Sequence, residues 1–104
     1  MFERPGTDSQ AVLVSLDFGD PEFAESTAEL VELTRSAGVR VVGMLKGRRD
    51  RPDPAHFAGS GKIDELAQLL DETGAKLVIF NHPLSPAQER NLEKRLACRV
   101  IDRV

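Results

Sequence analysis

The sequence predicts an α/β domain: a small, open, mostly parallel four-stranded sheet with helices on both faces. Short apolar runs of strand length alternate with stretches in which apolar residues recur at helical spacing, in the order β-α-β-loop-α-β-α-β. Strands joined through helices pair in parallel, through right-handed crossovers. A chain of 104 residues with 40% hydrophobic residues is long enough for one core but not for a second domain.

The chain is expected to divide into a leader and a single domain. Residues 1–10 are polar and contain Pro5 and Gly6, so we expect a flexible leader there. Residues 11–104 are then expected to form the α/β domain. It begins with a nearly continuous apolar run at residues 11–16, which predicts a strand buried on both faces.

A helix and a second strand follow. Asp20 is a suitable N-cap, Pro21 suits the first helical position, and Gly38 suits a left-handed helix end. The apolar run at residues 39–45 predicts the second strand, which leads directly into a loop over residues 46–62.

The second half of the chain repeats this alternation. A second helix ends at Gly74, and its predicted apolar stripe comprises Ile63, Leu66, Ala67 and Leu70. Residues 76–80 predict the third strand. Ser85 and Gln88 form a capping box that starts a third helix, and residues 99–102 predict a short fourth strand.

Composition excludes several classes of protein. No apolar run approaches the roughly 20 residues of a membrane span, and no secretory signal is present. Cys98 is the only cysteine, which fits a cytoplasmic protein and predicts a packing role for this residue. His56 and His82 have no partner at zinc-ligand spacing, so no metal site is expected.

Residues 46–62 concentrate positive charge in an otherwise acidic chain. The segment carries a net charge of +3 and the whole chain −3, so the remainder carries −6. Its charged residues are the cations Lys46, Arg48, Arg49, Arg51 and Lys62 and the acids Asp50 and Asp53. Such a segment favours binding of a polyanion such as phosphate or nucleic acid. The alternative is a solvated loop whose arginines pair with neighbouring carboxylates.

The segment ends in a possible anion-binding nest. Gly59, Ser60, Gly61 and Lys62 lead directly into the second helix, where free backbone N–H groups can surround an anion. A cation in the first helical turn opposes the helix dipole, and a bound anion would remove that conflict. The alternative is that Lys62 simply extends into water.

Two phosphate-linked functions do not fit the sequence. A nucleotide-hydrolysing P-loop requires Gly and Ser or Thr at positions that are occupied by His56 and Ile63. A phosphoacceptor receiver domain requires an aspartate after the third strand, where this chain has Asn81. No catalytic residue is therefore predicted in this chain.

The low aromatic content argues against recognition of nucleotide bases by stacking. The chain has no Trp and no Tyr, so base stacking could use only Phe18, Phe57 and the histidines. We expect Phe57 to pack the basic loop onto the sheet. Backbone phosphates are then the expected target, without base specificity. Three to five phosphate contacts predict that log K falls with log salt concentration with a slope of roughly −2 to −4.

Several motifs, in order along the chain, resemble one known family. They are Arg49-Asp-Arg-Pro-Asp-Pro, Phe57-Ala-Gly-Ser-Gly-Lys62, Leu77-Val-Ile-Phe-Asn81, Leu84-Ser-Pro-Ala-Gln88, Arg90-Asn-Leu-Glu93 and Val100-Ile-Asp-Arg103. Together they resemble the N-terminal domain of the HflX family of ribosome-associated GTPases. His82 and Pro83 depart from this family, which often has acidic residues at these positions.

The resemblance implies a bacterial, cytoplasmic protein that binds the large ribosomal subunit. In the family, a helical linker and a separate G domain follow this domain, and GTP binding and hydrolysis serve ribosome rescue or splitting. GTP and Mg would therefore be held by the G domain, which is absent from this sequence, and this fragment itself would need no cofactor.

The leading hypothesis is a module that binds ribosomal RNA. It uses the cations Arg48, Arg49, Arg51 and Lys62, with the backbone of Gly59, Ser60 and Gly61 as phosphate donors. One alternative is an ATP-binding domain with weak ATPase activity. Another is a regulatory domain that packs on the protein's own G domain.

Overall fold

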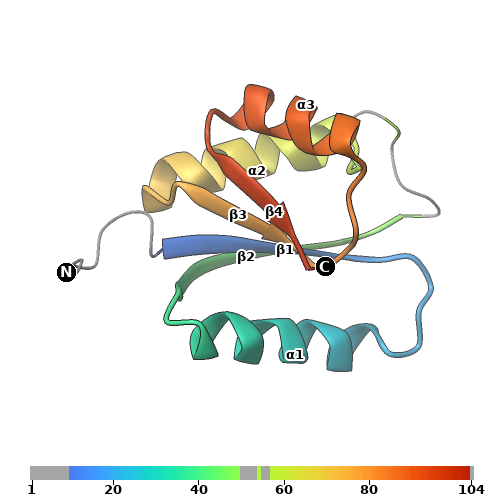
Figure 1. The fold of residues 1–104 in the computed structure, drawn as a ribbon. Coiled ribbons are helices and arrows are strands. Elements are labelled where there is room, and N and C mark those ends of the chain that lie inside the picture. The colour runs from blue at the N-terminus through green and yellow to red at the C-terminus, as the bar shows by residue number, and fades with distance from the viewer. Residues whose placement is uncertain (1–9, 50–53, 55–56, 104) are drawn as a thin grey trace.

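The computed structural model describes residues 10–49, 54 and 57–103. One four-stranded sheet has the order β2-β1-β3-β4, and all of its pairings are parallel. The elements are β1 (Gln10–Asp17), α1 (Phe23–Ser36), β2 (Arg40–Arg48), α2 (Ser60–Thr73), β3 (Leu77–Phe80), α3 (Pro86–Leu96) and β4 (Arg99–Asp102). Helix α1 covers one face of the sheet, and α2 and α3 cover the other (Figure 1). The predicted fold class is confirmed.

Strand β1 is the centre of the core. It pairs with β2 on one side and with β3 on the other, and residues 11–16 are at most 1% exposed. Side chains alternate between the two faces. Val12, Val14 and Leu16 pack in the cluster under α2 and α3, whereas Ala11 and Leu13 pack in the cluster under α1. The predicted strand is therefore buried on both faces, as its continuous apolar run indicates.

The ends of the helices confirm most of the predicted signals. Gly38 and Gly74 have φ of 83° and 75°, as expected for left-handed helix ends. The Ser85 hydroxyl accepts from the Gln88 backbone N–H at 3.1 Å, and the Gln88 side chain accepts from the Ser85 N–H at 2.9 Å. Helix α1, however, begins at Phe23 and not at Pro21. Asp20 accepts from the Glu22 N–H at 2.8 Å, so it caps the turn that precedes the helix.

The predicted end of the second strand is wrong. Strand β2 continues to Arg48, because residues 46–48 pair with residues 15–17 of β1. Lys46 and Arg48 are exposed and Gly47 lies half-buried between them. The backbone pairing with a central strand thus outweighs a local composition that is typical of a loop.

Candidate functional site

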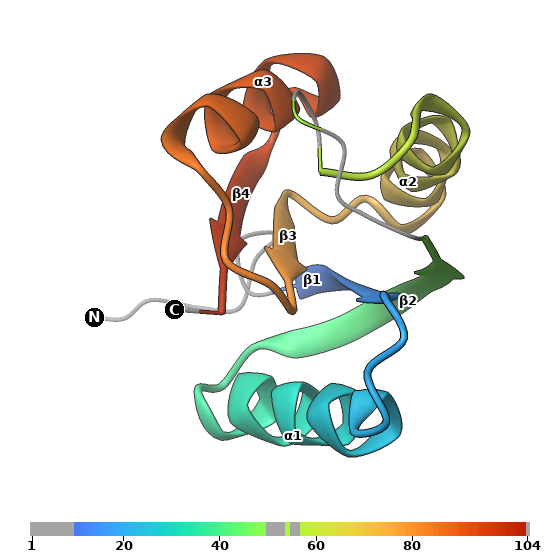
Figure 2. The same cartoon turned by 90° about the vertical axis from the view of Figure 1, so that its right-hand side faces the viewer.

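The carboxyl ends of all four strands meet at one edge of the sheet, which faces the viewer in Figure 2. Parallel sheets bind their ligands at this edge, most often at the point where the strand order reverses. In the order β2-β1-β3-β4, that point lies between β1 and β3. The predicted cations that the structure describes lie on one side of this point, beside β2 and the start of α2.

Glycines allow two cations to lie against the backbone at this edge. A Cβ added to Gly59 would come within 2.3 Å of Nη1 of Arg49, and one added to Gly47 would come within 2.5 Å of Cε of Lys62. The Arg49 side chain therefore lies against the start of α2, and the Lys62 side chain lies against the end of β2. We call Arg48, Arg49 and Lys62, together with Gly59, Ser60 and Gly61, the cationic surface.

The start of α2 has no side chain that caps it. Gly59 is the N-cap, and no side chain of the described residues accepts a capping hydrogen bond there. The first helical backbone bond joins the Ile63 N–H to the Gly59 carbonyl at 3.0 Å, so the three preceding N–H groups have no acceptor within the helix. Ser60 and Gly61 are exposed, and the first turn contains no acid. These are features that helix starts which bind anions share, and the predicted anion site stays a prediction.

Two of the cations have carboxylate neighbours at the surface. Arg48 Nη2 lies 3.5 Å from Asp17 Oδ2, and Lys62 Nζ lies 3.5 Å from Glu65 Oε1. Surface pairs of this length contribute about 0 to 1 kcal/mol. The Arg48 side chain remains 82% exposed, and the Lys62 side chain is 26% exposed. The pKa of Asp17 is lowered, first by the hydrogen bond that its carboxylate accepts from the Gly19 N–H and further by Arg48. Arg51 and His56 lie outside the described residues.

Phe57 joins the cationic surface to the sheet. Its side chain is 5% exposed, as expected for a residue that packs the loop onto the sheet. Its ring centroid lies 5.0 Å from that of His82, 5.5 Å from that of Phe18 and 5.9 Å from that of Phe80. The backbone of Phe57 has φ of 70°, a left-handed conformation that is uncommon for a bulky residue. The sequence carries no signal for this conformation.

A buried polar network lies beside these rings, between β1, α1 and β3. The Asn81 Nδ2 group donates to Ser15 Oγ at 3.1 Å and to Ser26 Oγ at 3.0 Å. Ser15 Oγ lies 2.7 Å from Thr27 Oγ1, and Thr27 donates to the Phe23 carbonyl. Thr27 has only one hydroxyl hydrogen, so Ser15 must be the donor to Thr27. The donor and the acceptor of each hydrogen bond in the network are thus defined.

Arg103 extends this network after β4. Its Nη1 donates to Ser26 Oγ and to Asn81 Oδ1, each at 2.8 Å, and its Nη2 pairs with Glu29. Sequence reasoning assigned no role to Ser26 or Glu29. No local pattern could have revealed it, because the partners come from α1, β3 and the end of β4.

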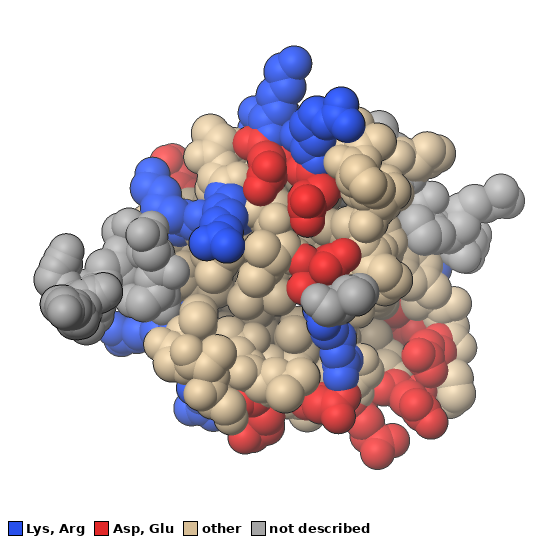
Figure 3. All heavy atoms as spheres, viewed as in Figure 1, with Lys and Arg blue, Asp and Glu red and all other residues tan. Residues whose placement is uncertain are grey.

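The opposite side of the edge is acidic. A hollow of about 500 Å³ lies beside Arg103. It is lined by Asp20, Glu22, Glu25, Ser26, Glu29 and Arg103. Acidic side chains gather over the N-terminal half of α1 (Figure 3). The edge is therefore divided, with cations beside β2 and α2 and carboxylates beside α1, so a polyanion is favoured only on the first side.

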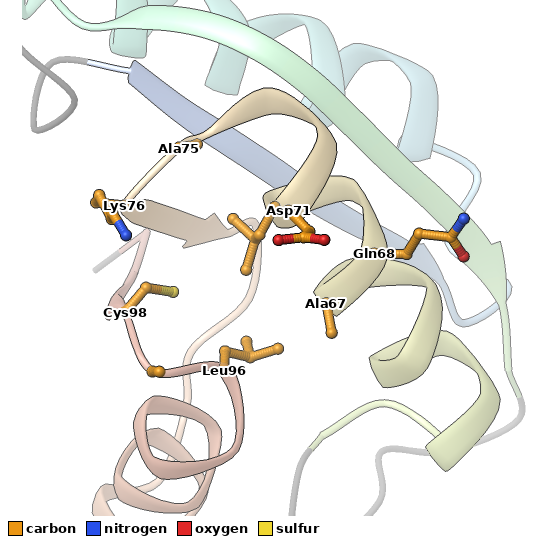
Figure 4. A pocket seen from close by; sticks show the side chains of 9 residues that line it. Ala67, Gln68, Asp71, Ala75, Lys76, Leu96 and Cys98 are labelled. Atoms are coloured by element: carbon orange, nitrogen blue, oxygen red, sulfur yellow. The ribbon is translucent and has the colours of Figure 1, made fainter.

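A further hollow, of about 450 Å³, lies at the other end of the sheet, between the C-terminal half of α2 and the turn before β4 (Figure 4). Lys76 and Cys98 line it. Burial raises the pKa of the Cys98 thiol, and Glu93 raises it further, which lowers its thiolate fraction. Within the described residues, no group of His, Cys, Asp and Glu could hold a metal ion. None of the described helices has the length and apolar character needed to cross a bilayer.

Comparisons with known proteins identify relatives over most of the chain. Residues 24–104 match the family described as "GTP-binding GTPase N-terminal". The chain is 47% identical over 103 residues to "GTPase HflX" from Escherichia coli, covering 99% of this chain and 24% of that protein. It is 43% identical over 84 residues to "GTPase HflX" from Alkalihalophilus pseudofirmus, covering 81% of this chain and 20% of that protein. The chain thus spans about a quarter of the length of these relatives.

Solved structures agree on the fold. A variant of SsGBP superposes with a TM-score of 0.68 at 22% identity, covering 89% of this chain and 28% of that one. A complex of SsGBP and GDP superposes with a TM-score of 0.63 at 21% identity, covering 89% and 26%. The confirmed α/β fold, the family match and the identities to the HflX proteins lead to one conclusion: this chain belongs to the HflX family of GTPases and corresponds to its N-terminal domain.

Proposed function

We propose that this domain docks on ribosomal RNA of the large ribosomal subunit through the cationic surface. Arg48, Arg49 and Lys62, with Arg51 beside them in the sequence, contact backbone phosphates. The backbone N–H groups of Gly59, Ser60 and Gly61 hold one phosphate at the start of α2. The parent protein acts in the cytoplasm, and its G domain binds and hydrolyses GTP with Mg during ribosome rescue or splitting.

One observation carries this proposal: cations lie beside a helix start that no side chain of the described residues caps. The Arg49 side chain lies against Gly59 and Lys62 lies in the first turn, so two cations lie at the positive end of the α2 dipole, where a bound anion is stabilised. Helix α3 in the same domain shows the contrast, because its start is closed by Ser85 and Gln88. A phosphate bound at α2 would accept hydrogen bonds from the N–H groups that have no acceptor within the helix, and it would face both cations.

Salt dependence of binding to large subunits tests the proposal. Changing Arg49, Arg51 and Lys62 together to Ala removes three phosphate contacts. The slope of log K against log salt should become shallower by about 2 to 3, and affinity at low salt should fall. The matched control changes the exposed residues Arg35, Lys94 and Arg99 to Ala, which alters net charge equally but lies elsewhere. Equal effects of the two triple variants would refute the proposal.

A single substitution tests the helix start itself. Gly59 has φ of −68° and ψ of 161°, which alanine can adopt, so Gly59→Ala should fold. The new methyl group would take the place of the Arg49 guanidinium and displace it from the helix start. We expect weaker binding to large subunits with little loss of stability. If displacement of Arg49 is the cause, Arg49→Ala should weaken binding by a similar amount, and combining the two changes should weaken it no further.

Direct measurements distinguish RNA docking from the two alternative functions, ATP binding and regulation of the G domain. Binding of ATP with weak hydrolysis would give heat in calorimetry at millimolar ATP and magnesium, and the RNA proposal predicts none. A regulatory domain that packs on the G domain would change the GTPase rate of the full-length protein in the absence of ribosomes when residues 1–104 are deleted.

A further inference from the structure

A small cavity lies at the point where the strand order reverses, between the carboxyl ends of β1 and β3. Its volume is about 150 Å³, and its lining comprises Leu16, Phe18, Asp20, Phe23, Ser26, Asn81 and His82. A cavity of about this volume can hold one aromatic ring. The lining mixes the rings of Phe18 and Phe23 with polar groups, as in sites that hold a planar polar molecule.

Two of the polar groups have a hydrogen to donate. His82 Nε2 accepts from the Leu16 N–H at 2.9 Å, which places the imidazole proton on Nδ1. Burial lowers the pKa of His82, which favours the neutral ring that this hydrogen bond requires. Ser26 Oγ accepts from both Asn81 and Arg103, which leaves its own hydrogen to donate. Among the described residues, neither hydrogen has an acceptor.

The third polar group is an acceptor. One oxygen of Asp20, Oδ1, accepts from the Glu22 N–H, and the other is not engaged by any described residue. The lining of the cavity therefore includes two residues with a hydrogen to donate, one carboxylate, and the aromatic residues Phe18 and Phe23. The carboxylates that line the neighbouring hollow beside α1 disfavour a phosphate here, but they do not oppose a neutral ring.

The cavity is connected to the cationic surface. The ring of Phe18 contacts the ring of Phe57, and Phe57 leads through Ala58 to the α2 helix start. The Arg49 N–H donates to the Asp17 carbonyl, next to Phe18. An RNA strand whose phosphates lie on the cationic surface can therefore direct one of its bases toward the cavity between β1 and β3.

We propose that this cavity receives one unstacked pyrimidine base of the RNA whose phosphates contact the cationic surface, an inference that rests on the proposed function. The pyrimidine O2 accepts from His82 or Ser26, and Asp20 accepts from N3–H of uracil or from the N4 amino group of cytosine. Proteins read single-stranded RNA by such splayed bases, held between aromatic rings and by hydrogen bonds to their edges. The domain would then add base recognition to phosphate binding.

Asp20→Asn tests the assignment without removing the cap, because asparagine can still accept from the Glu22 N–H. Free uridine, titrated to millimolar concentration, should shift the amide NMR signals of Ser26, Asn81 and His82. An oligouridylate should bind more tightly than an abasic strand of the same length. Asp20→Asn should weaken both uridine and oligouridylate binding by about tenfold, the loss of one charge-assisted hydrogen bond.

Glu25→Gln is the matched control, because it removes one nearby carboxylate that does not line the cavity. It should change affinity less than about twofold, since exposed charges interact weakly. Absence of uridine shifts, equal binding of the abasic strand, or equal effects of the two variants would overturn the inference.

The two proposals fail in different ways. An oligouridylate that binds with a steep salt slope while uridine gives no shifts would eliminate the base site and keep phosphate docking. Uridine shifts that persist, together with RNA binding that is insensitive to the Arg49, Arg51 and Lys62 triple variant, would keep the base site and eliminate the proposed docking surface.

Discussion

Phe57→Ala is predicted to be strongly destabilising, although Phe57 lies at the end of a basic loop. The side chain is 5% exposed and is enclosed by the rings of Phe18, Phe80 and His82. Truncation of such a ring costs about 3 to 5 kcal/mol. For a domain of this size, the lower figure lowers the melting temperature by about 12 to 24 °C. Thermal and urea unfolding followed by circular dichroism measure both quantities.

The left-handed backbone of Phe57 makes a second, sharper prediction. At φ of 70°, a residue with a Cβ is strained by about 1 to 2 kcal/mol, whereas glycine is not. Glycine loses about 0.5 to 1 kcal/mol more than alanine through its entropy in the unfolded chain. Phe57→Gly should therefore be as stable as Phe57→Ala, or up to about 1.5 kcal/mol more stable.

A helical position provides the control. Leu66 is buried in α2, where glycine is about 1 kcal/mol less favourable than alanine. Leu66→Gly should thus be less stable than Leu66→Ala, the reverse of the order at Phe57. The reasoning is refuted if the Phe57→Ala variant is more stable than the Phe57→Gly variant by about 0.5 kcal/mol or more. It is also refuted if Phe57→Ala lowers the free energy of unfolding by less than about 1 kcal/mol.

Two further predictions concern pH and capping. The pKa of His82 is lowered by burial from an ordinary value of 6.5, so the unfolded chain binds a proton more readily and the free energy of unfolding should fall as pH decreases below about 6.5. His82→Gln, which keeps an acceptor for the Leu16 N–H, should flatten this dependence in urea titrations between pH 7 and 5, and an unchanged slope would contradict the assignment. Ser85→Ala should cost about 1 kcal/mol in urea unfolding because it opens the capping box of α3, and it should leave RNA affinity unchanged. A cost below a few tenths of a kcal/mol would show that the cap is not needed.

The sequence predicted the parts of the fold that depend on local signals. The buried strand β1 follows from a continuous apolar run, and the helix ends at Gly38, Gly74 and Ser85 follow from residues with strong conformational preferences. The end of β2 was predicted too early. Residues 46–48 have the composition of a loop, and only their pairing with β1 places them in the sheet.

The candidate site was predictable only in part. The glycines and cations of the cationic surface are close in sequence, so a local motif revealed them. The contacts of Asn81 with Ser15 and of Arg103 with Ser26 span 66 and 77 residues. Such contacts exist only after the sheet and α1 are assembled, and no periodicity or motif in a single sequence records them. The left-handed conformation of Phe57 accompanies ring contacts with residues distant in the sequence, such as His82.

The strand order β2-β1-β3-β4 suits a polypeptide that folds while it is being synthesised. Residues 10–48 can complete a β-α-β unit before β3 emerges. Strand β3 then adds to the free edge of β1, and β4 adds to the free edge of β3. No strand has to be inserted between two that have already paired, so the nascent domain grows outward from its first strand without undoing earlier contacts.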